Sequence, residues 1–392
     1  MIRLVYLTDY SEMYSYRLLK GIVAYSRTHE PWAVSRIPSS YKLTVGFRRF
    51  AEQARRWNAD AVIGQFEPDD DVEIFARYGI TAYAQDHIRR FSAIPNISGD
   101  YIPTGRHAAD FYVSKGFRSF AFLGAKGRVW SDERAIGFYR RIHQLGFGHC
   151  FSRYDEDLSR LNSYFDRGPL LAWLRSLPAS TAVFACDDTM ANRLLEICQL
   201  HGISVPSQIA VLGVDNDEII STLTTPQLSS ISLDVESAGM ELASVLSRHI
   251  SEGRRSSLPD IIVRHAHIFD RTSTDYFDSR DPHLHTVMEY IRNHLTADIS
   301  VSDLVRLVPL SRRLLEIRFK EATSQSIYQY IFNSRLQLFA DKLLSTDHPI
   351  GVLCDSSGLG DLKNVSRQFK ARYGMTPSAY RRAHSPVPLL LT

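Results

Sequence analysis

The stretch VSDLVRLVPLSRRLLEIRF, residues 301–319, decides the fold of the C-terminal part of the chain. It predicts a helix that ends near Pro309, a tight turn capped by Ser311, and a second helix that is basic on its outer side. The apolar faces of the two helices consist of Leu304, Val305 and Val308, and of Leu314, Leu315 and Phe319. Helix, tight turn and basic helix is the layout of a helix-turn-helix unit.

The same pattern recurs about 50 residues further along. A short helix at 350–356 is ended by Gly358, and a second basic helix follows at 362–373. A long helix at 327–344 lies between the two units. From Asp281 to His384 the chain carries fourteen basic and ten acidic residues, a net charge of +4, whereas the rest sums to −1. This distribution favours a polyanion as partner of the C-terminal part.

Three ordered motifs in this part resemble the AraC/XylS family of regulators. They are VPLSRRLLEIRFK, RLQLFADKLL and FKARYGMTPSAYRR. The resemblance implies binding to a double-stranded DNA operator. The residues we expect at the DNA are Ser311, Arg312, Arg313, Arg318, Lys363, Asn364, Arg367 and Lys370. Departures from the family pattern at Gln325, Cys354, Leu359 and Val365 leave open whether the second unit reads bases or mainly contacts phosphates.

The first two-thirds of the chain alternates short strands with amphipathic helices, which predicts parallel α/β sheets. The expected strands are 3–7, 61–63, 81–83, 119–123, 182–185 and 209–214. The expected helices are 14–28, 47–57, 71–78, 103–115, 131–144, 170–177 and 188–201. Open α/β sheets bind ligands beyond the carboxyl ends of their strands. The polar residues that follow these strands are therefore the candidates for a binding site.

Those candidates fall in three motifs that resemble the LacI-type, periplasmic-binding-protein-like sensor domain: FAFLGAKGRVWSDERAIGF, VFACDDTMA and VLGVDNDEIISTLTTPQLSSI. The resemblance implies a bound sugar and directs Asp187, Asp215, Trp130 and Arg134 at it. The full set of expected ligand residues is Asp9, Trp130, Ser131, Arg134, Asp187 and Asp215. We expect Asp188 to cap the following helix, and Asp187 to reach the ligand.

The order of the two parts, sensor first and DNA-binding domain last, and the junction RTSTDYFDSRDP resemble regulators of xylose operons over nearly the full length. This implies xylose or a related monosaccharide as effector. We expect a sensor at 1–270, a linker at 271–281, the AraC-type domain at 282–384 and a tail at 385–392. Within the sensor, the two lobes are expected at 1–113 plus 229–257, and at 117–226 plus 260–270.

Other function classes remain as alternatives. The carboxylates of Asp187 and Asp215 are also what a sugar-cleaving enzyme requires, and a pure solute receptor is a third reading. No cysteine or histidine spacing suits a metal, no cofactor is expected, and no apolar run approaches the ~20 residues that span a membrane. We expect a cytoplasmic protein that forms a homodimer through residues 1–270, with RNA polymerase as a further candidate partner.

Overall fold

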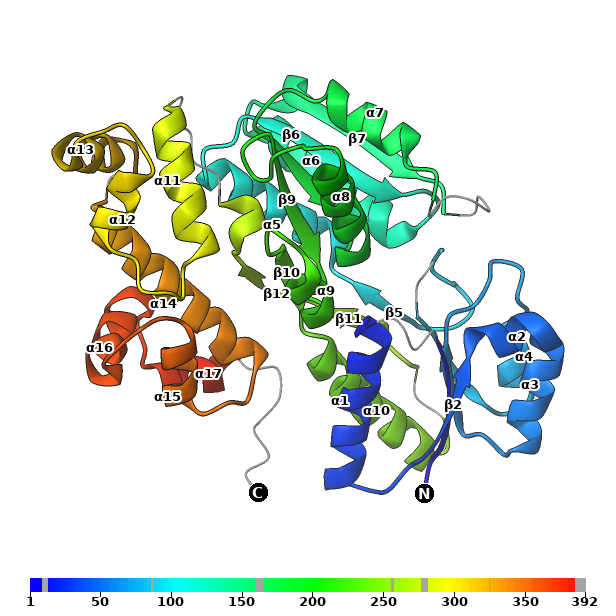
Figure 1. The fold of residues 1–392 in the computed structure, drawn as a ribbon. Helices are drawn as coiled ribbons and strands as arrows, with labels where there is room; N and C mark the ends of the chain where they lie inside the picture. The colour runs from blue at the N-terminus through cyan, green and yellow to red at the C-terminus, as the bar shows by residue number, and fades with distance from the viewer. Residues whose placement is uncertain are drawn as a thin grey trace. The chain divides into compact units, whose positions relative to one another are not determined.

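The computed structural model describes residues 1–8, 13–85, 88–158, 165–254, 257–275, 281–323 and 325–384 (Figure 1). The chain divides into two compact units, Met1–Ile268 and Phe269–Thr392. The first is α/β and the second is helical, as the sequence predicts. Within these described ranges, no helix is long and apolar enough to cross a membrane.

The first unit contains two six-stranded sheets in its described residues. One sheet has the order β11-β5-β4-β3-β1-β2 and the other the order β12-β10-β9-β8-β6-β7. The first comprises β1 (Arg3–Thr8), β2 (Ala33–Pro38), β3 (Ala61–Gly64), β4 (Thr81–Gln85), β5 (Asn96–Gly99) and β11 (Ile261–Val263). The second comprises β6 (Ser119–Ala125), β7 (Phe151–Glu156), β8 (Thr181–Ala185), β9 (Ile209–Val214), β10 (Ser229–Leu233) and β12 (His265–Phe269). Apolar β-branched and aromatic residues fill most of these strands, so the sheets form the cores of two lobes.

The helices of this unit cover the sheets. They are α1 (Met13–Thr28), α2 (Ser39–Val45), α3 (Phe47–Arg56), α4 (Ile74–Arg77), α5 (Tyr101–Ser114), α6 (Val129–Gln144), α7 (Gly168–Ser176), α8 (Asp188–Leu200), α9 (Glu218–Leu223) and α10 (Val235–Ser251). Helix α1 packs on α10, and α5 packs on α6.

Glycines allow both helix pairs to touch backbone to backbone. A Cβ at Gly105 would lie 2.1 Å from the carbonyl oxygen of Arg134, and one at Gly21 would lie 2.1 Å from that of Glu236. Any larger residue would therefore force the helices apart. The two close crossings fix the backbone at Arg134 and Glu236, the residues that carry the polar contacts described below.

The chain passes between the two sheets after β5, after β10 and after β11. Hydrogen bonds tie these three crossings together: Asp234 N donates to Arg264 O at 2.8 Å, and Asp100 pairs with His265 at 2.6 Å. The expected lobe boundaries are therefore wrong in three places. Helix α5 packs on α6, β10 pairs with β9, and β11 pairs with β5. The chain changes lobe at strand ends, where the sequence shows no compositional break.

Sequence patterns missed several strands, and the reason is clear for three of them. Strands β2 and β7 are edge strands with little burial, and their sequences AVSRIP and FSRYDE carry no alternation strong enough to identify them. Strand β10, SSISL, is fully buried, but three of its five residues are serine. Their hydroxyls are accommodated by hydrogen bonds such as Ser232 Oγ to His267 O at 3.1 Å.

The second unit is helical throughout its described part, with two apolar cores. Its helices are α11 (Pro282–Asn293), α12 (Val301–Arg306), α13 (Arg312–Thr323), α14 (Ile327–Ser345), α15 (Ile350–Ser356), α16 (Leu362–Tyr373) and α17 (Pro377–His384). Helices α11 to α13 and the first half of α14 build one core, and the second half of α14 with α15 to α17 builds the other. Helices α12 to α16 coincide with segments expected to be helical.

Candidate ligand-binding and DNA-binding sites

A buried carboxylate holds the segment that follows β9. Asp188, the first residue of α8, accepts hydrogen bonds from Asp217 N at 2.7 Å and from Ser230 Oγ at 2.6 Å. Gly213 lies so close that a Cβ there would be 2.1 Å from Asp188 Oδ1. Asp188 thereby fixes the turn that contains Asp215, whose φ of 104° is rare for a residue other than glycine.

Asp187, rather than Asp188, caps helix α8. Its Oδ1 accepts a hydrogen bond from Met190 N at 2.7 Å. The expected assignment of the cap was wrong because Asp188 turns instead toward the segment after β9, which the sequence alone does not bring near it. Burial raises the pKa of the Asp187 carboxyl, and the Met190 N–H and the charge of Arg134 oppose that rise. A carboxylate can accept several hydrogen bonds, so ligand contact by Asp187 stays a prediction.

Arg134 lies buried among aromatic rings near the start of α6. Its guanidinium carbon is 5.1 Å from the ring centroid of Tyr101 and 5.6 Å from that of Trp130, which are cation–π distances. Nη1 donates to the carbonyl oxygen of Cys186 at 2.5 Å. Its Nε has no hydrogen-bond partner among the residues that the structure describes. An unpaired buried donor costs about 1–3 kcal/mol, so this atom suits an acceptor supplied by a ligand.

Ser131 is fully buried one residue after Trp130. Its Oγ accepts a hydrogen bond from Ala125 N at 2.9 Å and so ties α6 to the end of β6. This contact supports the backbone at the carboxyl end of the strand. The expected ligand contact of Ser131 is a separate role and stays a prediction.

Cys186 marks the place where the expected ligand residues meet. Burial raises the pKa of its thiol well above the usual value, and the charge of Asp187 adds to this. Arg134 and a hydrogen bond with Ser131 oppose the rise, and Asp215 contributes a smaller increase. Four residues expected at the ligand thus act on one buried thiol. Asp9, the remaining expected acid, lies outside the described residues.

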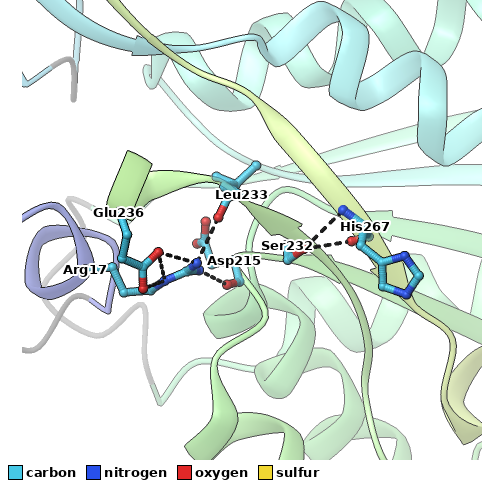
Figure 2. A network of polar contacts seen from close by, with 6 residues as sticks. All are labelled: Arg17, Asp215, Ser232, Leu233, Glu236 and His267. Atoms are coloured by element: carbon cyan, nitrogen blue, oxygen red, sulfur yellow. Dashed lines mark hydrogen bonds and ion pairs between the residues drawn. The ribbon is translucent and has the colours of Figure 1, made fainter. Parts of the chain in front are cut away.

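Arg17 joins the two lobes beside this cluster (Figure 2). Its guanidinium forms an ion pair with Glu236 of α10, with Nη2 to Oε2 at 2.6 Å. The same side chain donates to two carbonyl oxygens of the other lobe, Leu233 O at 2.9 Å and Asp215 O at 3.3 Å. No sequence pattern singles out Arg17, because its partners lie about 200 residues away along the chain.

The first helix-turn-helix unit consists of α12 and α13. Ser300 and Asp303 form a capping box at the start of α12. Ser311 is exposed, and its Oγ accepts a hydrogen bond from Leu314 N at 3.3 Å, so it caps α13 as expected. The buried side of α13 is formed by Leu315 and Phe319, both fully buried.

Two of the arginines on α13 form ion pairs with carboxylates of the C-terminal unit. Arg312 pairs with Glu316 at 3.0 Å, and Arg318 pairs with Asp281 at 2.8 Å. Desolvation raises the pKa of Asp281, but the Arg318 and His283 hydrogen bonds together lower it below the ordinary value. Arg313 is exposed, and no side-chain partner of it is found among the described residues.

The second helix-turn-helix unit consists of α15 and α16. Asp361 caps α16 by accepting a hydrogen bond from Lys363 N at 3.0 Å. Arg367 donates to Asn364 Oδ1 at 2.9 Å, and both residues are exposed. Lys370 is exposed one turn further on. All the DNA-binding residues expected on α16 therefore face solvent.

Three of the four departures from the family pattern lie in the second helix-turn-helix unit. Cys354, Leu359 and Val365 are all buried in its core, at most 5% exposed. Gln325, between α13 and α14, accepts a hydrogen bond from Asn333 Nδ2 at 2.7 Å. The three buried residues preserve the packing of the second helix-turn-helix unit. None of the four departures bears on whether that unit reads bases.

Helix α14 carries a buried acid in its second half. Asp341 is 4% exposed, and burial raises its pKa to about 7 against the opposing effects of Arg271 and Gln337. Gln337 Nε2 donates to Asp341 Oδ1 at 3.1 Å, and Tyr373 of α16 donates to Gln337 at 2.8 Å. Asp341 therefore belongs to the core of the second helix-turn-helix unit.

Two families match the chain in succession. Residues 109–274 match the periplasmic binding protein-like domain, and residues 304–383 match a helix-turn-helix domain. The chain is therefore a DNA-binding transcription regulator in which a periplasmic-binding-protein-like domain precedes a helix-turn-helix domain. It is a regulator rather than an enzyme, so the alternative of catalysis by Asp187 and Asp215 is set aside.

Its similarity to individual regulators extends over the full length. It is 27% identical to the xylose operon regulatory protein of Escherichia coli K12, over 99% of this chain and 98% of that one. The solved structure of the xylose-binding transcription activator XylR matches with a TM-score of 0.69 and 26% identity over 98% of both chains. A LacI-type regulator from Alkaliphilus metalliredigens, complexed with D-xylulofuranose, shares the fold over 70% of this chain and 99% of its own, with a TM-score of 0.57 and 18% identity.

Proposed function

We propose that the first unit binds xylose or a closely related monosaccharide beside Arg134, Asp187 and Asp215, and that this binding controls how the second unit binds its operator. The observation that carries the proposal is the buried Nε of Arg134, which lacks a partner among the described residues. A sugar hydroxyl is an acceptor of the right size for it. The same hydroxyl can donate to a neighbouring carboxylate.

The surroundings of Arg134 suit a sugar in two further respects. Carboxylates accept hydrogen bonds from hydroxyls, and Asp187 and Asp215 both lie near Cys186. Aromatic rings pack against the apolar face of a pyranose, and Trp130 and Tyr101 flank the guanidinium. Sugar-binding relatives with this fold, among them the xylose-binding activator, support the same ligand class.

Control of the operator requires that the sugar bind one arrangement of the lobes better than another. A ligand held both by Arg134 and by groups of the other lobe meets this condition. Arg17 already links the lobes at Asp215, so the cluster lies where a relative movement of the lobes changes the geometry. Movement of the lobes is then passed on through the residues that follow β12.

For the assembly, we propose a homodimer formed through residues 1–270 that binds a repeated operator in the cytoplasm. Two helix-turn-helix units in each chain suit tandem or inverted half-sites. A regulator acts where the chromosome is, and RNA polymerase remains a candidate partner for one that activates. Light scattering at micromolar concentration tests the dimer. A monomer with and without sugar and DNA contradicts it.

The test of the ligand site is calorimetric titration with xylose, arabinose, ribose and glucose, paired with titration of operator binding. Arg134→Lys retains the charge and removes Nε, so xylose affinity should fall at least about tenfold. Asp215→Asn tolerates the positive φ and removes the charge, and it should abolish the response to sugar while basal DNA affinity stays within a few-fold.

Arg141→Lys is the matched control, because Arg141 lies on the same helix and pairs with Asp110 at 2.6 Å. It should leave both titrations unchanged. A wild-type response to xylose in Arg134→Lys and Asp215→Asn contradicts the placement of the site. Binding of none of the four sugars by the wild type contradicts the choice of ligand.

A further inference from the structure

The solvent side of α13 has an apolar residue at its centre. Because Leu315 and Phe319 are fully buried and successive helical residues are 100° apart, the opposite face consists of Arg313, Ile317, Lys320 and Glu321. Along the helix Ile317 follows Arg313 and precedes Lys320, and it is 45% exposed. A β-branched apolar side chain in this place gains nothing from the core of the unit, since it points away from it.

Helix α16 supplies a direct comparison within the same chain. Its buried residues Val365 and Phe369 stand 50 positions after Leu315 and Phe319, so the two helices share one register. At the position of Ile317, α16 has Arg367. The two helices therefore present the same backbone frame with an apolar residue in one and a cation in the other.

Acidic residues on α13 restrict what the helix can approach. Glu316 holds Arg312 in an ion pair, and Glu321 lies on the exposed side one turn after Ile317. Carboxylates repel phosphates, so this face is poorly suited to lie along the DNA backbone. Base edges in the major groove offer donors, acceptors and one apolar group, the 5-methyl of thymine.

We propose that Ile317 is a specificity-determining residue that contacts the 5-methyl group of a thymine in the major groove, next to a base pair read by Arg313. The inference rests on operator binding by the C-terminal unit, Phe269–Thr392. It adds which base Ile317 selects. Arg313, one turn earlier on the same face, is free to bind guanine because it has no side-chain partner among the described residues. Ile317 then covers the methyl of a neighbouring base pair.

The experiment begins with selection of a binding site from random duplex DNA by the full-length protein, with and without xylose. Each thymine of the selected site is then replaced by deoxyuridine, which removes only the methyl group. One or two replacements should weaken binding about three- to fivefold, the effect of exposing roughly one methyl-sized apolar group. Replacements elsewhere should have no effect.

The variant Ile317→Ala should bind the thymine and deoxyuridine sites equally, because the partner of the methyl is gone. Ile136→Ala is the matched control: Ile136 is a helical isoleucine of similar exposure, 37%, in the other unit, and its removal should leave the deoxyuridine effect intact. A circular dichroism melt confirms that both variants are folded.

Three results would overturn the proposal. The first is a scan in which no thymine depends on its methyl, and the second is a full deoxyuridine effect in Ile317→Ala. The third is loss of the deoxyuridine effect in Arg367→Ala rather than in Ile317→Ala, which would assign the methyl contact to the second helix-turn-helix unit. Failure of the selection itself, with no enriched site, would instead contradict operator binding.

Discussion

The two helix-turn-helix units of this chain share one frame and differ in their charges. In the first, Arg312 and Arg318 are paired with carboxylates at 3.0 and 2.8 Å. In the second, Lys363, Arg367 and Lys370 are exposed, and none has a carboxylate partner among the described residues. The core residues at equivalent positions are similar, so the difference belongs to the surfaces that meet DNA.

The two helix-turn-helix units therefore offer different surfaces to DNA although they share one fold. Cations without acidic partners attract phosphates regardless of sequence and add counterion release to the affinity. Cations held by carboxylates are restricted in position and contribute less to that attraction. We interpret the first unit as the one that selects bases and the second as the one that contributes sequence-independent affinity.

The largest expected effect comes from removing Arg313. A bidentate contact from arginine to guanine is worth about 1–3 kcal/mol of discrimination, so Arg313→Ala should relax preference at one operator position. Lys370→Ala should weaken binding to all sequences alike and reduce the salt slope by about 0.9. Fluorescence anisotropy on the operator and on single-base variants, at several salt concentrations, measures both. Equal losses on every sequence for the two variants would remove the distinction between the units.

An intermediate effect is expected from pH, which should separate the two cores. The raised pKa of Asp341, about 7, means that stability from its neutral form is present below about pH 4 and is lost as the pH rises through 7. The pKa values of Asp281 and Asp303, which lie beside the core of the first helix-turn-helix unit, are lowered. The stability that these two carboxylates contribute is therefore constant from pH 5 to 8. Of the two helix-turn-helix cores, only the second, which contains Asp341, should lose stability between pH 5 and pH 8, by up to about 2 kcal/mol.

Hydrogen exchange, corrected for intrinsic rates, can follow α13 and α16 separately at pH 5 and pH 8. Asp341→Asn keeps the hydrogen bond from Gln337 and should abolish the pH dependence of α16. Asp355→Asn changes an exposed acid of the same unit and serves as control. If α13 and α16 lose protection together in the wild type, Asp341 does not set the difference.

The smallest expected effect concerns Arg318. Asp281→Asn keeps a residue that caps α11 but removes the ion pair, at a cost of a few tenths of a kcal/mol because Arg318 is 40% exposed. The released arginine can then reach a phosphate, so affinity for all sequences should rise about twofold and the salt slope should steepen. Unchanged affinity and slope would show that pairing does not keep Arg318 from DNA.

The helical unit could be predicted from sequence because its signals are local. Caps such as Ser311, the glycine at 358 and the apolar spacing of Leu315 and Phe319 all act within a few residues. The α/β unit was predicted less completely. Its lobes are formed by a chain that crosses three times, and the pairing of β11 with β5 joins residues more than 160 positions apart.

The candidate ligand site shows the same limit. Strand-end positions and the family resemblance predicted Arg134, Asp187 and Asp215 as ligand residues, and the charges of all three affect the pKa of the Cys186 thiol. Two adjacent acids, Asp187 and Asp188, could not be told apart, because the partners of Asp188 come from the segment after β9 and from β10. Arg17 could not be found at all, since an arginine on an amphipathic helix is typical of a solvated surface.

The contacts of Arg17 with the second lobe have a consequence for how such a sensor can diversify. Both acceptors, Asp215 O and Leu233 O, are main-chain oxygens, so they persist whatever side chains occupy those two positions. The side chain at 215 can therefore change its chemistry while the bridge between the lobes stays intact. If the first unit binds its sugar at this site as proposed, point mutation at residue 215 can exchange one sugar for another while the contacts of Arg17 are kept.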